Sequence, residues 1–458
     1  MRTPSQAGVS GERRHLSGKA ALTPPRSVDL GGTGLSPEIS ALLGQRWVSV
    51  LTIIAAVITG ESLRCGHRRE LHVRKIAATA LALLVPLAAA PAASASVEPA
   101  PAADRSTVVV VGHRGAAGHR PEHTQGGYEL AVAMGADWIE PDLVPTKDHV
   151  LVVRHENEIS GTTDVSLRPE FAARRTTKVV DGRDVTGWFT EDFTLAELKT
   201  LRAVERLPAI RQRNTVYNGS YQVLTFQEVL DLAKRLSHRY GRQVGVFPET
   251  KHPTYFRSIG LPLEEPLIET VKRNGLDRPN SPVVVQSFEP SSLKRVAKEL
   301  RVPLWQALGT TGRPYDLTAA GDPTTYADMM KPEGLAKIAT YAQWIGPDKS
   351  SAIPVNPDGG SGTPTTLVSD AHKAGLRIGV YTFRSENQYL PLQLRRGQAP
   401  TDHGDALAEY RAHLDLGVDA FVTDYPDAAV LVRAERGAPR KQVQPQQFDN
   451  GLPEEGQE

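Results

Sequence analysis

Two histidines are the residues of this chain best suited to proton transfer. His113 and His155 each follow an apolar run rich in β-branched residues. At a shared site, one imidazole could take a proton from a nucleophile while the other gives one to a leaving alkoxide. Arg114 and Lys251 could hold a phosphate, the arginine as a fork and the lysine as a point charge. A purely structural role, the usual one for a lone histidine, would have to apply twice.

Three acids indicate a cation site. Glu140 and Asp142 lie two residues apart in an extended run, so their side chains point to the same side. Glu249 ends another such run. Three carboxylates at one place repel one another unless they are protonated or bridged, and an all-oxygen cluster suits Ca²⁺ or Mg²⁺ rather than zinc. The alternatives are three unrelated surface acids or an arginine-paired network.

Nine short apolar runs supply the strands that must position these side chains. Amphipathic helix patterns lie between many of them, and this alternation is typical of a parallel α/β fold. Polar or charged residues follow nearly every run, as expected where strand ends share one active-site mouth. The predicted strands are Thr107–Gly112, Trp138–Leu143, Val150–Arg154, Val244–Glu249, Pro282–Gln286, Pro303–Leu308, Tyr341–Gly346, Arg377–Thr382 and Asp419–Thr423.

Nine strands are one too many for a (β/α)8 barrel. The link between the second and third runs is too short for a helical crossover, which needs about ten to twelve residues. Val150–Arg154 should therefore return antiparallel as a hairpin that turns at Thr146–His149. This turn would place His155 opposite Glu140 and near Asp142. Eight strands then remain, and we predict an α/β fold, a (β/α)8 TIM barrel.

One connection is much longer than the fold requires. A single helix would suffice between His155 and Val244, yet most of that stretch precedes the helix predicted at Thr225–Tyr240, which begins at the capping box Thr225–Glu228. We predict an insertion at about residues 156–221, at the barrel rim after the second βα region. A second capping box, Thr194–Glu197, lies inside it. Long loops on a rigid barrel commonly shape specificity.

The first hundred residues do not resemble a folded domain. The apolar run Ile76–Ala90 follows several basic residues and precedes a small-residue exit, a pattern typical of a secretory signal. We expect cleavage after Ala95 and a secreted or cell-envelope protein, with residues 1–105 divided into extension, signal and linker. A start assigned too far upstream, a genuine extension and an uncleaved anchor are the alternatives. Residues 106–435 should form the barrel domain and 436–458 a disordered polar tail.

Composition excludes several classes of function. The formal net charge of +1 gives no sign of a nucleic-acid binder, so an anionic substrate must be met by local positive charge. The single cysteine, Cys65, precedes the expected cleavage point, which argues against a disulfide scaffold or a thiol metal site. Neither a Gly-x-Ser-x-Gly elbow nor a phosphate-cradling Walker loop occurs.

With these residues in place, the stretch Gly112–His155 resembles the glycerophosphodiester phosphodiesterase family. It is most similar to the exported, calcium-dependent bacterial branch. The likeness spans roughly Val108–Leu431 in the family's order, and its opening block is highly specific. The further matching segments are Pro248–Lys251, Gln286–Phe288, Ile345–Pro347, Tyr381–Arg384 and Phe421–Asp427.

The resemblance implies hydrolysis of glycerophosphodiesters, such as glycerophosphocholine, to sn-glycerol 3-phosphate and an alcohol. It implies a divalent cation, with Ca²⁺ expected and Mg²⁺ the alternative. Two departures are Glu156, where the family usually has Asp, and His123, where it often has Asn. The implied roles are acid and base for His113 and His155, phosphate contacts for Arg114 and Lys251, metal ligands for Glu140, Asp142 and Glu249, and support for Glu122, Gln286 and Tyr381.

Three other functions fit parts of this pattern. A barrel phospholipase of C or D type would need an apolar rim, whereas 156–221 is mostly polar and charged. A non-catalytic surface-binding barrel would be expected to lack an acid or a histidine, and a sugar hydrolase would not need two histidines. The sequence leaves open the head group, the acid and base assignment, the attacking group (water or the substrate's own glycerol hydroxyl) and the oligomeric state. We expect a small-molecule partner, and no stable membrane insertion of the mature domain.

Overall fold

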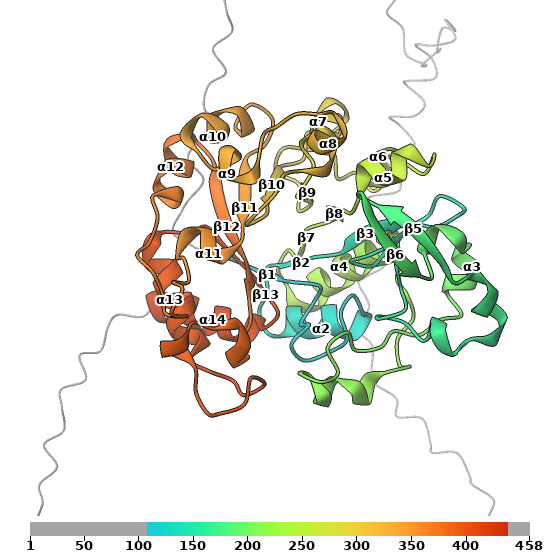
Figure 1. Cartoon of the computed structure of the whole chain (residues 1–458), viewed down its shortest axis with the longest axis horizontal. Helices are drawn as coiled ribbons and strands as arrows, with labels where there is room; N and C mark the ends of the chain where they lie inside the picture. The colour runs from blue at the N-terminus through green and yellow to red at the C-terminus, as the bar shows by residue number, and fades with distance from the viewer. Residues whose placement is uncertain (1–107, 438–458) are drawn as a thin grey trace, which may run out of the picture. The chain divides into compact units, whose positions relative to one another are not determined.

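The computed structural model describes residues 108–437 of the 458-residue chain. The predicted extension, signal segment and linker lie outside this range, as does the predicted tail after Gly437. The described residues form a curled, mostly parallel sheet with helices around its outside (Figure 1). The predicted α/β class is therefore confirmed. Among these residues no helix is long and apolar enough to cross a membrane.

Eleven strands form one sheet in the order β4-β3-β8-β9-β10-β11-β12-β13-β1-β2-β7. Every pairing within it is parallel except that of β3 with β4. All nine predicted runs coincide with strands, with small shifts at their ends. The bounds are β1 Val109–Gly112, β2 Trp138–Ile139, β3 Asp142–Pro145, β4 Leu151–Val153, β7 Gly245–Val246, β8 Glu249–Thr250, β9 Val285–Ser287, β10 Leu304–Leu308, β11 Trp344–Pro347, β12 Arg377–Phe383 and β13 Ala420–Thr423.

Two prolines interrupt strands at the point where the acids lie. Pro141 separates β2 from β3, and Pro248 separates β7 from β8, because proline has no N–H to donate to a ladder. Their carbonyl groups still accept, Pro141 from Glu249 N at 3.0 Å and Pro248 from Gln286 N at 2.9 Å. The interrupted strands therefore stay side by side.

The predicted hairpin between β3 and β4 is present. The two strands are antiparallel, with Leu143 opposite Val153. Arg154 N donates to Asp142 O at 2.9 Å, so continuing the register places His155 opposite the residue between Glu140 and Asp142. The predicted pairing of His155 with Glu140 is thus wrong by one residue, because the turn is centred half a residue later than the sequence suggested. His155 still lies close to Asp142.

Helices follow most of the parallel strands. Thr225 caps α4 and Glu228 returns the bond, so the predicted capping box is confirmed, as is that of Thr194 and Glu197 at α3. The helices outside the long β4–α4 connection are α2 Gln125–Ala133, α4 Phe226–Tyr240, α5 Pro253–Ser258, α6 Glu264–Arg273, α7 Pro290–Glu299, α8 Tyr315–Ala319, α9 Tyr326–Met329, α10 Pro332–Ile338, α11 Lys349–Ala352, α12 Leu367–Lys373, α13 Ala406–Leu416 and α14 Pro426–Gly437, with short 3-10 turns η5 Asn387–Tyr389 and η6 Leu392–Leu394.

The long connection between β4 and α4 has structure of its own. A hairpin pairs β5 Thr176–Val180 with β6 Arg183–Gly187, separate from the main sheet. This hairpin was not predicted from the sequence. The other elements are η1 Val165–Leu167, η2 Pro169–Arg174, η3 Thr190–Asp192, α3 Leu195–Leu198 and η4 Gln212–Tyr217.

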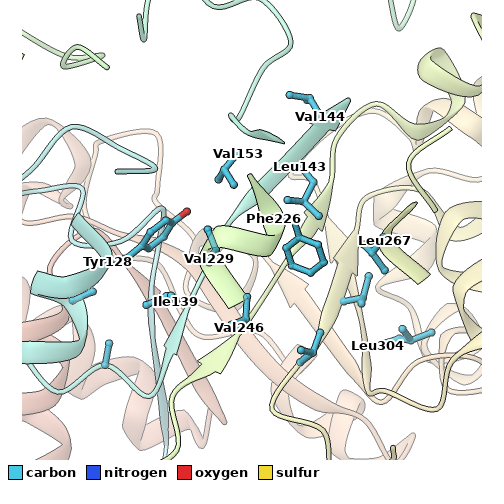
Figure 2. Close-up of a cluster of buried hydrophobic side chains, with 14 of the residues drawn as sticks. Tyr128, Ile139, Leu143, Val144, Val153, Phe226, Val229, Val246, Leu267 and Leu304 are labelled. Carbon is cyan, nitrogen blue, oxygen red and sulfur yellow. The ribbon is translucent and has the colours of Figure 1, made fainter. Parts of the chain in front are cut away.

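Two apolar clusters lie on opposite faces of the curled sheet. In the larger one, Phe226 and Val229 of α4 lie near Leu143 of β3 and Val153 of β4 (Figure 2). Side chains alternate along a strand. On β10, Leu304 accordingly belongs to this helix-facing cluster. The next residue, Trp305, belongs to the second cluster, on the inner face of the sheet.

The inner cluster is built around Trp305. Its ring stacks on Trp344 with centroids 5.0 Å apart and meets Phe247 edge-on at 4.7 Å. Gly346 and Gly379 make room for the indole, since a Cβ on either would lie 1.9 or 2.1 Å from its atoms. Aromatic packing therefore fills the inner face beneath the strand ends that carry the polar residues.

Candidate active site

The predicted site residues meet in one cavity of about 320 Å³. A larger cavity of about 550 Å³ beside α4 contains none of them. The predicted residues that line the smaller cavity are His113, Arg114, Glu140, His155, Glu249, Lys251, Gln286 and Tyr381. Asp142 and Glu122 lie behind this lining, and each pairs with Arg114. The sequence therefore identified side chains that the fold brings together.

His113 lies at the end of β1 and is held by Asp424, which follows β13. Its Nδ1 is 2.5 Å from Asp424 Oδ1. Because a carboxylate only accepts, Nδ1 donates and Nε2 keeps its lone pair. Nε2 faces the acids, 3.8 Å from Glu140 Oε2. Burial lowers the pKa of His113 to about 4 despite Asp424, so the free ring is neutral at neutral pH.

His155 lines the same cavity and has the same kind of partner as His113. Its Nδ1 lies 2.5 Å from Glu156 Oε1, so its Nε2 is also free to accept a proton. Burial, Arg114 and Lys251 lower the pKa of His155. The side chain is 29% exposed, against 10% for His113, which makes His155 the more accessible of the two histidines.

Glu140, Asp142 and Glu249 form the expected acidic cluster. Each offers an oxygen, and the three oxygens lie within 4.8 Å of one another. All three residues are buried. Burial and the neighbouring carboxylates raise the pKa of Glu140 well above its usual value. Mutual repulsion in a buried place is the condition that a bridging cation relieves.

These residues fit a divalent cation. Asp142 Oδ1 is buried and makes no hydrogen bond, and Lys251 Nζ is 3.7 Å away. The other oxygen of Asp142 accepts from His123 Nε2 at 2.9 Å, which orients the carboxylate. Gln286 Nε2 donates to Glu140 Oε1 at 2.6 Å. An all-oxygen set oriented by second partners suits Ca²⁺ or Mg²⁺.

The two predicted phosphate contacts line the cavity but already have carboxylate partners. Arg114 NH1 donates to Glu122 Oε2 at 2.8 Å. Lys251 Nζ lies 2.6 Å from Glu249 Oε1. Burial lowers the pKa of Lys251, but the charges of Asp142 and Glu249 more than offset this, so the pKa is raised overall. Both cations therefore stay charged beside the cavity, and their contact with phosphate stays a prediction.

The three supporting residues have distinct partners. Glu122 holds Arg114, and Gln286 holds Glu140. Tyr381 donates its hydroxyl to Leu308 O at 2.8 Å and presents its ring to the cavity. Tyr381 thus shapes the wall.

Cation affinity should fall as the pH is lowered through about 7. Burial raises the pKa of Glu249 to about 7. Below that pH a proton competes with the cation for this carboxylate, and above it the carboxylate is ionised and free to bind the cation. We expect calorimetric Ca²⁺ titrations to show about tenfold weaker binding at pH 6 than at pH 8. Glu249→Gln should reduce this pH dependence, and what remains is expected from Glu140, whose pKa is also raised by burial and the neighbouring carboxylates. Equal affinity at both pH values in the unmodified protein would contradict the assignment.

Several partners of the predicted residues were missed. Asp424 follows a predicted strand, so it counted among the polar residues at strand ends. Nothing in the sequence indicated its contact with His113. Arg206 and Arg211 lie in the β4–α4 connection, where no periodic pattern gave them a place. Arg206 pairs with Glu122 and Glu156, and Arg211 donates to Asp424 at 2.6 Å.

Comparison with known proteins decides the family. The sequence model of the glycerophosphoryl diester phosphodiesterase family matches residues 113–428, which include every predicted site residue. The chain belongs to this family. Its enzyme class is accordingly phosphoric diester hydrolase, and the activity predicted from the sequence is confirmed.

Two sequence relatives agree with this membership. A glycerophosphodiester phosphodiesterase of Arabidopsis thaliana is 36% identical over 328 residues, covering 68% of this chain and 82% of the relative. One from Haemophilus influenzae is 28% identical over 383 residues, covering 78% and 98%. A solved Oleispira antarctica phosphodiesterase in complex with the product sn-glycerol 3-phosphate is 18% identical, covering 71% and 96%, with a TM-score of 0.44.

Proposed function

We propose that this chain is an exported, calcium-dependent member of the family. In this proposal it releases sn-glycerol 3-phosphate and an alcohol from glycerophosphodiesters in the cavity of His113 and His155. The observation that supports it most is the pairing of both histidines, through Nδ1, with a carboxylate. Each pairing leaves an Nε2 free beside three buried acids and two cations.

The two histidines would share the proton transfers. One accepts a proton at Nε2 from the attacking water as a new P–O bond forms. If the substrate's own glycerol hydroxyl attacks instead, the first product is a cyclic phosphate, which water then opens to sn-glycerol 3-phosphate. The P–O bond to the head-group oxygen breaks, and the other histidine protonates that leaving oxygen. Bound phosphate raises the pKa of a nearby imidazole because opposite charge favours the protonated form. Glu140, Asp142 and Glu249 would hold a cation, which when bound supplies positive charge for the phosphoryl oxygens.

The architecture is part of the proposal. We infer a complete (β/α)8 barrel, because the parallel pairings follow the predicted strand order and β1 pairs with both β2 and β13. Residues 156–221 would be an insertion at its rim. Export through a signal cleaved after Ala95 predicts that protein recovered outside the cell begins at Ser96. N-terminal sequencing checks this, and an intact N-terminus on exported protein would contradict it.

Product identity tests the proposed reaction. Purified protein with Ca²⁺ and glycerophosphocholine should give sn-glycerol 3-phosphate and choline. Phosphorus NMR identifies the phosphate product as it forms. Phosphocholine and glycerol would mean that the other ester bond breaks, which contradicts the proposal. Phosphatidylcholine vesicles should remain intact, and their cleavage would favour the phospholipase alternative. Failure to turn over any diester would favour a non-catalytic binding barrel.

A further inference from the structure

Both histidines of the site depend on arginines from one short piece of chain. Arg206 and Arg211 lie five residues apart in the β4–α4 connection, outside every strand of the main sheet. Each arginine binds a carboxylate that in turn binds a histidine. One chain of contacts leads to His155 and the other to His113.

The first chain of contacts runs through Arg206. Its Nε donates to Glu122 Oε2 and its NH2 to Glu122 Oε1, both at 2.7 Å. NH2 also donates to Glu156 Oε2, and the other oxygen of Glu156 lies 2.5 Å from His155 Nδ1. Glu122 itself holds Arg114. Arg206 therefore fixes the partners of one histidine and of one predicted phosphate contact.

The second chain of contacts runs through Arg211. Its NH2 donates to Asp424 Oδ2 at 2.6 Å, and the other oxygen of Asp424 binds His113. Its Nε donates to Glu386 Oε1 at 2.7 Å, and its NH1 to Ala117 O at 2.9 Å. The guanidinium is a rigid planar fork, so three simultaneous bonds fix its own position. One of the three holds Asp424, whose Oδ2 also accepts from Arg384 Nε at 2.9 Å.

The segment that carries these arginines is braced. Glu205 accepts from Leu207 N and from Asn214 Nδ2, both at 2.9 Å, and its own N–H donates to Asn218 Oδ1 at 2.8 Å. Val204 N donates to Thr162 O at 3.0 Å. These hydrogen bonds tie the segment to itself and to Thr162, so they restrict the positions of the two arginines.

We propose that Arg206 and Arg211 are positioning residues of the reaction, which fix the carboxylates behind His155 and His113. The proposal rests on the proposed function, in that the histidines transfer protons. It assigns the long connection a part in catalysis itself, beyond shaping the rim. A histidine that keeps its Nδ1 bond keeps one tautomer and one ring direction, as a productive proton transfer requires.

The two arginines should differ in their kinetic effect. Arg211 acts on His113 through Asp424, so Arg211→Ala should lower kcat by about tenfold to a hundredfold with little change in KM. Arg206 also holds Glu122 and hence Arg114, so Arg206→Ala should lower kcat and raise KM together. Arg174→Ala is the matched control, because Arg174 makes a two-bond pair with Glu197 in the same connection.

Rescue separates positioning from folding. Guanidinium chloride at non-denaturing concentration should restore part of the kcat of Arg211→Ala, and Arg211→Lys should retain more activity than the alanine variant. In an Asp424→Asn background, Arg211→Ala should cost much less than in the parent, because both changes break one chain of contacts. Thermal melting identifies a variant that has failed to fold, and for such a variant the lysine substitution provides the test.

Defined outcomes overturn this proposal. Unchanged kcat in folded Arg206→Ala and Arg211→Ala would do so, as would a loss in Arg174→Ala of the same size. Additive effects of Arg211→Ala and Asp424→Asn would also contradict it. Failure of the proposed function is a separate result, because the parent protein would then release no sn-glycerol 3-phosphate before any variant is made.

Discussion

Replacing His113 by alanine should lower kcat for glycerophosphocholine hydrolysis by about a hundredfold or more. The reason is geometric. Asp424 holds Nδ1, so the free Nε2 is the proton-transfer atom, and alanine leaves nothing in its place. His155→Ala should cause a loss of similar size, since His155 is bound to Glu156 in the same way. Initial rates of sn-glycerol 3-phosphate release at saturating Ca²⁺ measure both effects.

A control histidine makes this result specific. His238 is exposed on α4, away from the cavity, so His238→Ala should keep the activity of the parent. Near-normal kcat in folded His113→Ala or His155→Ala would refute the assignment of proton transfer to these residues. A loss of kcat in only one of the two variants would show that the two-histidine mechanism is wrong.

Asp142→Asn should remove most of the calcium-dependent activity. Asparagine has the same shape and can still accept from His123, but it carries no charge for a cation. A bound metal contributes several kcal/mol of charge stabilisation, and about 1.4 kcal/mol corresponds to a factor of ten, so a loss of about a hundredfold or more is expected. Calorimetry should show Ca²⁺ binding weakened in parallel with turnover.

The matched control is Asp231→Asn, an exposed acid on α4. Its Ca²⁺ affinity and activity should equal those of the parent. If Asp142→Asn bound Ca²⁺ as tightly as the parent and kept its rate, the acidic cluster would not be the cation site. If it bound Ca²⁺ normally but lost activity, the residue would have a different role in catalysis.

Much of the fold was predictable because strand and helix signals were local. Nine apolar runs marked the eleven strands of the main sheet, because two of these runs are each divided at a proline into two strands. The capping boxes at Thr194 and Thr225 marked two helix starts. The short link to Val150 required the antiparallel hairpin. Its register was predicted wrongly by one residue because the centre of a turn is not defined by composition alone.

The β5–β6 hairpin had a signal that was overlooked. Asp181 and Gly182 separate two runs of alternating residues, and an Asp-Gly pair favours a two-residue hairpin turn. Both residues have positive φ, 48° and 76°, as such a turn requires. The strands are short and largely exposed, so hydrophobic periodicity did not reveal them.

The site was predictable only as far as strand ends reveal it. Nearly every predicted residue lay at or just beyond the end of a recognisable strand, the exception being Glu122 on the loop after β1. Parallel strands bring their ends to one mouth. The contact of His113 with Asp424 joins residues 311 positions apart, through the pairing of β1 with β13. Arg206 and Arg211 come from a connection without periodicity, so only the folded chain assigns their partners.

The most direct test is sn-glycerol 3-phosphate release from glycerophosphocholine by protein treated with chelator and then titrated with Ca²⁺. We predict loss of activity in chelator and its return with Ca²⁺, saturating at one ion for each active site. Release that continues unchanged in chelator would contradict the metal role of Glu140, Asp142 and Glu249, and with it the proposed mechanism.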